Sequence, residues 1–269
     1  MPAARKTTTR KPAPARSAAA KPTAARLSLA EALAALEKAG SEPTRKTYLR
    51  HGAEEPLFGV KFADLKLLVK RIGVDHELAL ALWKTKNHDA RVLALKIADP
   101  ARIQAAELDR WARDLRVRMC KGYVAMLAAE SPHGAAKARE WSSSDDEALR
   151  STGWSLCGML ATADESTPDE WYLKRIAEIE KSIHSAPNAE KEAMNMALIT
   201  FGGRNETLRK AALAAAKRIG KLEVDHGDTD CKTPDAGAYI EKMWAHAKAK
   251  KFVSPAAQER AREPMRTRC

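Results

Sequence analysis

Five basic side chains fall between Asp109 and Lys121, opposed only by Asp109 and Asp114. Arginine and lysine residues spaced about three apart share one side of a helix, or of the turn that enters it. Such a basic strip can neutralise phosphates, and arginine can grip a phosphate through two parallel hydrogen bonds. A solvated helix face with i,i+4 charge pairs is the alternative. The members of the basic strip are Arg110, Arg113, Arg116, Arg118 and Lys121.

Arg150 is a separate candidate for a phosphate contact. It follows the apolar Leu149 in the first turn of a well-marked helix, and Trp154 lies one turn further on. This position suits an arginine that reaches a phosphate, with the tryptophan beside it. A buried salt bridge of Arg150 is the competing interpretation.

Residues 224–235 (VDHGDTDCKTPD) combine aspartate, histidine and cysteine, which are metal-ligand types. A second Cys/His cluster is missing, however, and aspartate with glycine also makes turns. Residues 233–235 (TPD) favour the start of a helix with proline at its first position. We therefore expect a structured loop before a capped helix, with no metal and no cofactor. The sequence also lacks nucleophile-elbow, zincin, P-loop and dinucleotide-binding motifs, so no catalytic residue is assigned.

The elements that position these residues are helices. Ser28 and Glu31 have the spacing of a capping box, which predicts a helix to about Ala39, closed by Gly40. Asp75 is placed to cap another helix. Apolar residues recur at three- and four-residue spacing, and no stretch alternates as a strand would. Further helix faces are predicted around residues 65–72, 90–97, 149–160, 193–201, 208–219 and 240–247.

We count about twelve helices of about 10–18 residues joined by short polar turns, which predicts an all-α protein. Successive short amphipathic helices favour a repeat array in which each pair needs its neighbours to bury its apolar stripe. A compact helical bundle is the alternative. An α-solenoid would curve and offer one concave face, which suits a long polymer.

The net charge of +12 is concentrated at the two ends of the chain. Residues 1–26 hold seven basic side chains and no acid, and residues 248–269 hold seven basic and two acidic side chains. Residues 27–247 carry 33 of each sign, so a binding face there requires segregated charge. We expect residues 1–26 to be a disordered basic tail that holds phosphates, residues 27–247 to be the helical domain, and residues 248–269 to be a basic C-terminal tail.

Composition excludes several classes of protein. No stretch approaches the ~20 apolar residues that span a bilayer, so we expect no membrane association through a transmembrane helix. The four cysteines form no CxxC pair, which fits a reducing cytoplasm, or the nucleoid if the protein is bound to DNA. We expect a monomer.

Four segments resemble the AlkD-like DNA alkylation repair family. Residues 55–70 (EPLFGVKFADLKLLVK) are similar to its YFGVKxPDLRxLxK opening, and residues 88–96 (HDARVLALK) to its xExRxLALxLL helix. Residues 146–154 and 190–198 fall where two later helices of that family fall. The resemblance covers roughly residues 45–245. It implies HEAT-like repeats that cradle duplex DNA, and in active members the excision of N3- and N7-alkylated purines.

The resemblance also shows where this chain departs from the active members. Their WDxxD helix aligns with residues 117–121, so that Val117 replaces the tryptophan and Lys121 replaces the second aspartate. Their AxGWALR tryptophan aligns with Met196, and only Arg150 matches the third position. A cation at 121 would oppose the positive charge that develops on the sugar as the base leaves.

Three functions follow as hypotheses. The first is a DNA-binding member of the family that holds duplex DNA in a basic concave groove, through Arg113, Arg116, Arg118, Lys121, Arg150 and Trp154. The second is an active alkylpurine DNA glycosylase with rearranged residues. The third is a helical-repeat scaffold for an acidic protein partner, which a concave face without basic residues would favour.

Overall fold

The computed structural model describes residues 26–115, 118–227 and 229–268, without the side chains of Arg118 and Met119. Within these ranges the chain forms fourteen α-helices. The described part contains no strand, only an isolated bridge between Gly40 and Val60. This confirms the predicted all-α class. All but the last residue of the predicted N-terminal tail lies outside the described residues.

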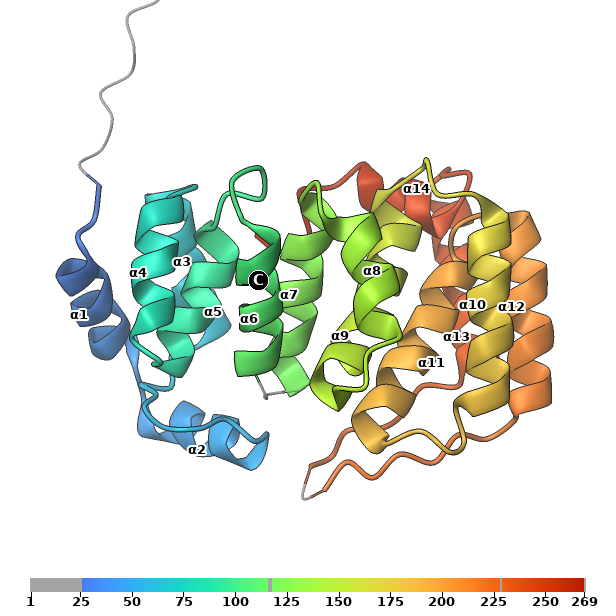
Figure 1. The fold of residues 1–269 in the computed structure, drawn as a ribbon, viewed down its shortest axis with the longest axis horizontal. Helices are drawn as coiled ribbons and strands as arrows, with labels where there is room; N and C mark the ends of the chain where they lie inside the picture. The colour runs from blue at the N-terminus through green and yellow to red at the C-terminus, as the bar shows by residue number, and fades with distance from the viewer. Residues whose placement is uncertain (1–25, 116–117, 228, 269) are drawn as a thin grey trace, which may run out of the picture.

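Ten of the helices pack as five successive pairs (Figure 1). The second helices of the pairs contact one another in chain order and form one continuous inner row. This arrangement is that of a helical-repeat array, as the solenoid prediction required. The pairs are α4 (His76–Lys84) with α5 (His88–Ile97), α6 (Ala105–Asp114) with α7 (Arg118–Glu130), α8 (Gly134–Ser142) with α9 (Glu147–Ala163), α10 (Asp169–Ser182) with α11 (Asn188–Gly202), and α12 (Glu206–Ile219) with α13 (Ala236–Ala249).

The remaining helices extend or close this array. They are α1 (Leu29–Ala39), α2 (Glu42–Arg50), α3 (Phe62–Ile72) and α14 (Pro255–Arg260). Helices α1 and α3 pack against α5, whereas α14 packs against α9 and α13. Apolar side chains from all the pairs merge into one core, to which Trp111 and Trp141 contribute fully buried rings. None of the described helices is both long and apolar enough to cross a membrane.

Local signals in the sequence begin and end the helices as predicted. The Ser28 hydroxyl accepts from the Glu31 amide while the Glu31 carboxylate accepts from the Ser28 amide, which completes the capping box. Asp75 accepts from the amide of Leu78 and caps α4. Gly73 ends α3 at a φ of +69°, a conformation that favours glycine. These ends are set by short-range hydrogen bonds, so they can be read from neighbouring residues alone.

Helix α2 is absent from the predicted helices because its sequence, EPTRKTYLR, has no apolar stripe and buries only Tyr48. Its place depends on the loop of residues 54–61, which joins it to α3. The carboxylate of Asp89, which is 2% exposed at the start of α5, accepts hydrogen bonds from the backbone amides of three consecutive loop residues. These amides belong to Phe58 (2.6 Å), Gly59 (3.0 Å) and Val60 (2.8 Å). One buried side chain thus holds the connection that orients α2.

The described C-terminal residues fold onto the array and differ from the basic tail expected for residues 248–269. Helix α13 ends at Ala249, α14 follows, and the chain runs back toward the inner row. The Arg266 guanidinium, 3% exposed, donates to the carbonyls of Leu95 (2.7 Å) and Lys96 (2.8 Å) and pairs with Glu130 (2.9 Å). The Lys96 ammonium in turn donates to the Arg266 carbonyl. The positive charge of Arg266 therefore has a role inside the fold, because its guanidinium donates to backbone carbonyls at the C-terminal end of α5.

Candidate functional site

A groove with a volume of about 620 Å³ lies along the inner row of helices. Its floor is formed by α7, α9 and α11. Two further segments line it. One is residues 50–52, the last residue of α2 and the turn that follows it, and the other is the loop between α12 and α13, which contributes His226, Thr229 and Cys231. Helix α2 and this loop both extend beyond the same edge of the array (Figure 1). The groove is therefore bordered by elements from both ends of the chain.

Small side chains from all three helices form part of the floor of the groove. Gly122 of α7, Ser155 and Gly158 of α9 and Ala197 of α11 all line it. At Gly158 a Cβ atom would lie 2.7 Å from the Thr200 hydroxyl, so the close approach of α9 to α11 requires glycine there. Small residues and hydroxyls allow a ligand backbone to approach the helices closely.

Lys121 carries the positive charge at the floor. Its ammonium donates to the Ser151 hydroxyl at 3.0 Å, which holds the side chain across α7 and α9. Cys120, one residue earlier, is fully buried, and burial raises the pKa of its thiol to about 12. This thiol is therefore not a nucleophile at neutral pH. The floor supplies a cation and hydroxyls, which can bind an anion.

The loop between α12 and α13 has defined internal contacts. The His226 ring nitrogen Nε2 lies 2.9 Å from the Thr233 hydroxyl, and the Asp225 carboxylate accepts from the Gly227 amide. Buried Asn195 of α11 donates to the Pro234 carbonyl and attaches the loop to the inner row. Asp235 caps α13, so the helix begins after residues 233–235 and not within them as predicted. Across residues 26–115, 118–227 and 229–268, no three His, Cys, Asp or Glu side chains gather as a metal site.

The six predicted contact residues do not all lie together. Lys121 lines the groove, whereas Arg113 sits at the end of α6, half-exposed and 3.7 Å from Asp146. Arg116 lies outside the described residues, as does the side chain of Arg118. Met196, which the resemblance aligned with the family's tryptophan, lines the groove and is 40% exposed. Lys121 and Met196, two of the positions at which this chain departs from the active members, thus border the same cavity.

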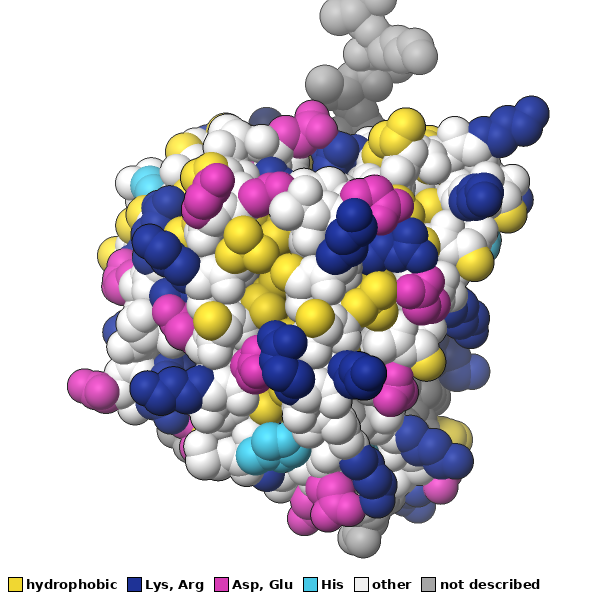
Figure 2. All heavy atoms as spheres, turned by 90° about the vertical axis from the view of Figure 1, so that its right-hand side faces the viewer, with side chains coloured by type: hydrophobic (Ala, Val, Ile, Leu, Met, Phe, Trp, Pro, Cys, Tyr) yellow, Lys and Arg dark blue, Asp and Glu magenta, His cyan; other side chains and the backbone are white. Residues whose placement is uncertain are grey.

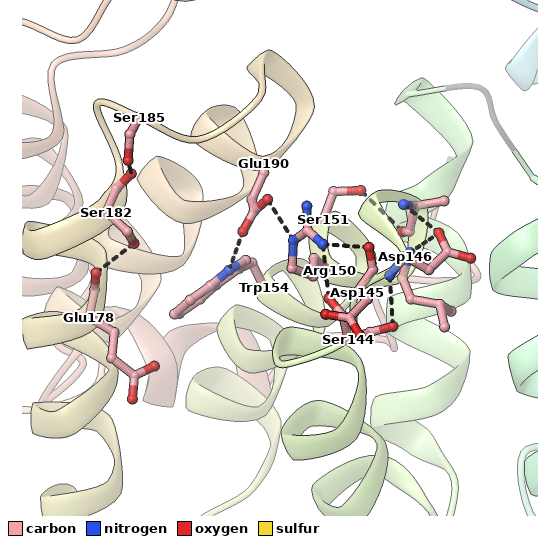
Figure 3. Close-up of polar contacts among 12 residues, drawn as sticks. Ser144, Asp145, Asp146, Arg150, Ser151, Trp154, Glu178, Ser182, Ser185 and Glu190 are labelled. Carbon is pink, nitrogen blue, oxygen red and sulfur yellow. Dashed lines mark hydrogen bonds and ion pairs between the residues drawn. The ribbon is translucent and has the colours of Figure 1, made fainter.

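Arg150 and Trp154 belong to a polar network between α9 and α11 (Figure 3). The Glu190 carboxylate of α11 accepts from Arg150 Nε at 3.0 Å and from Trp154 Nε1 at 3.3 Å. Arg150 also donates to the backbone carbonyls of Ser144 and Asp145. Trp154 is 3% exposed, so its ring packs in the core and does not reach the surface. The network joins α9 to α11, and the salt bridge considered as an alternative for Arg150 is present.

Replacing Glu190 with alanine is expected to lower the free energy of unfolding by roughly 2–4 kcal/mol. The change leaves the partly buried Arg150 without its carboxylate and the Trp154 indole N–H without an acceptor. Urea denaturation followed by circular dichroism measures the loss. Glu190→Gln keeps an acceptor and should lose less. Equal stability of the alanine variant and the unmodified protein would show that the network contributes nothing.

Charge is arranged differently on another face of the molecule. The end formed by α10, α12 and α13 shows Lys and Arg interspersed with Asp and Glu around apolar side chains (Figure 2). Arg218 of α12 pairs with Glu180 of α10 through two hydrogen bonds of 2.6 and 2.8 Å, and Arg209 pairs with Glu241 of α13. Cations neutralised in this way bind phosphates weakly. The charged side chains among the described residues that line the groove are Arg50, Lys121 and Glu192.

Comparisons with known proteins identify the family of this chain. The sequence model described as DNA alkylation repair enzyme matches residues 31–240. Uncharacterized proteins of Listeria monocytogenes and Listeria innocua are 31% and 30% identical over 207 residues, which cover 74% of this chain and 89% of each relative. A solved structure is described as a new family of proteins related to the HEAT-like repeat DNA glycosylases with affinity for branched DNA structures. It matches with a TM-score of 0.72 and 30% identity, covering 84% of this chain and 96% of that chain. The chain therefore belongs to the DNA alkylation repair family and has its HEAT-like helical fold.

Proposed function

We propose that the protein binds DNA in the groove, along the backbone of a duplex or of a branched junction, without releasing bases. The observation that carries this proposal is the presence of Lys121 on the groove floor, at the position that the resemblance assigns to a catalytic aspartate. A lysine there attracts phosphates, which is what DNA binding requires. It also disfavours the oxocarbenium-like state of base excision.

The related solved structure independently supports the proposal that the protein binds DNA. That protein is described by its affinity for branched DNA and by its relation to the glycosylases. In this chain the groove combines Arg50 and Lys121 with hydroxyls such as Ser155, which are phosphate-binding groups. The basic residues in the groove favour DNA over an acidic protein partner. The phosphates of DNA are regularly spaced along the strand, so they can contact successive helices of an extended array.

A second candidate function rests on Glu192. This carboxylate of α11 lines the groove that contains Lys121. A carboxylate that faces the sugar of a bound nucleotide could stabilise positive charge there, which is the role that the active family members give to aspartate. Under this alternative the protein is an alkylpurine DNA glycosylase with a relocated acid.

The test measures binding and base release with the purified full chain. Fluorescence anisotropy on a duplex and on a four-way junction is followed between about 50 and 200 mM salt, where phosphate contacts weaken steeply. Release of 7-methylguanine from methylated duplex DNA is assayed in parallel. We expect salt-dependent binding and no released base. Failure to bind either DNA at low salt would refute the proposal, and base release that is lost in Glu192→Gln would establish the second candidate.

A further inference from the structure

Two segments far apart in the sequence line one cavity. The last residue of α2, Arg50, and the turn after it, with His51 and Gly52, form one side, and the loop between α12 and α13 contributes His226 and Thr229. The inner helices α7, α9 and α11 lie between them as the floor. Neither segment is part of the repeated helix pairs. Without these two segments the inner face of the array would be open, so the two segments narrow the groove.

Each segment places a histidine at the groove. His51 follows the last residue of α2, beside exposed Arg50, and is partly exposed itself. His226 is also partly exposed, and its ring is held by the hydrogen bond between Nε2 and the Thr233 hydroxyl. Histidine is the side chain that ordinarily changes charge between pH 5 and 8. A protonated ring donates from both nitrogens, which suits a phosphate oxygen.

We propose that the turn after α2 and the loop of His226 form a two-sided clamp on one DNA strand, and that His51 and His226 take up protons when the strand is bound. This rests on the proposed function. The cavity of about 620 Å³ is in the range of small-molecule sites, so only a short stretch of one strand of the bound DNA enters it between the two segments. A branch point, at which strands separate, presents such a stretch.

The charges that face the two histidines set the direction of the effect. Among the described residues that line the groove, the cations are Arg50 and Lys121 and the carboxylate is Glu192. In the sequence of the loop, the charged residues around His226 are the acids Asp225, Asp228 and Asp230 and the cation Lys232. A bound phosphate adds negative charge next to both rings and favours their protonated form. Binding therefore takes up protons, so affinity must rise as the pH falls.

The size of the effect follows from linkage. Each ring that is protonated in the bound state is expected to raise the affinity about tenfold as the pH falls from about 8 to 5.5. Two rings would give up to about a hundredfold between roughly pH 8 and 5.5. DNA phosphates remain ionised over this range, so the change in affinity with pH comes from groups of the protein.

The experiment measures the affinity of the full chain for a four-way junction from about pH 8 to 5.5 at constant ionic strength. His51→Gln and His226→Gln should each remove part of the pH dependence, and the double variant should bind equally at all pH values, with the affinity of the unmodified protein at pH 8. His184→Gln is the matched control, because exposed His184 bonds the Ile219 carbonyl at the end of α12 and does not line the groove. Thermal unfolding at each pH checks that the variants remain folded.

The outcomes separate the two proposals. Binding with a pH dependence that the double variant retains would overturn the clamp, as would pH-independent binding by the unmodified protein. In both cases the proposed function stands. Absence of binding to duplex and junction at every pH overturns the proposed function and the clamp together. A pH dependence removed by the double variant and kept by His184→Gln supports both.

Discussion

Asp89→Ala should lower the free energy of unfolding by about 3–5 kcal/mol, the largest loss that we expect from a single substitution in this chain. The carboxylate accepts from three consecutive backbone amides, and those of Gly59 and Val60 are buried. Alanine leaves these donors without an acceptor in a site that is closed to water. Urea denaturation followed by circular dichroism at 222 nm measures the change.

The matched control is Asp64→Ala. Asp64 is also an acid in the first turn of a helix, α3, but it is partly exposed. Only its interaction with the helix dipole is lost, so it should cost less than about 1 kcal/mol. Asp89→Asn, which keeps the shape and one acceptor oxygen, should fall between the two. Similar losses for Asp64 and Asp89 would mean that the three amide hydrogen bonds do not fix the loop before α3.

Lys121→Glu should weaken DNA binding by roughly tenfold to a hundredfold at moderate salt, the largest effect on affinity that we expect. The substitution removes the phosphate contact that we propose for Lys121 and places a negative charge on the floor of the groove. The slope of log affinity against log salt should become shallower by about one, because one fewer counterion is released. Fluorescence anisotropy across a salt series measures both quantities.

Lys181→Glu is the control for the change in net charge. Lys181 is exposed in the last turn of α10 and does not line the groove. The two variants have the same net charge, so a long-range electrostatic effect would weaken binding in both. Equal DNA affinities of Lys121→Glu and Lys181→Glu would therefore show that Lys121 does not contact the DNA.

Features encoded by neighbouring residues could be predicted from the sequence. Ser28 and Glu31, three residues apart, form their capping box, and Asp75 caps α4. Lys121, which aligns with a family motif, lines the groove, while its contact with DNA stays a prediction. Met196 was aligned in the same way and lines the same cavity. Local hydrogen bonds and a fixed order of helices are sufficient for such predictions.

Contacts between distant residues could not be predicted in this way. Arg150 and Glu190 are 40 residues apart, and nothing in the first turn of α9 indicates which carboxylate would pair with it. Trp154 is buried by the same pairing of α9 with α11. Helix α2 was missed because its stability comes from Tyr48 and the loop held by Asp89, not from an apolar stripe. The turn at His51 therefore could not be recognised as part of the groove.

The position of Arg266 bears on how the array unfolds. A helical-repeat protein whose repeats contact only their neighbours can lose structure from one end, repeat by repeat. Here Arg266 is bonded to Leu95 and Glu130, which are 171 and 136 residues away in the chain. Fraying of the C-terminal helices would therefore expose the end of α5, and opening of α5 would release the C-terminal segment. This link favours a single cooperative unfolding transition over sequential melting of the repeats.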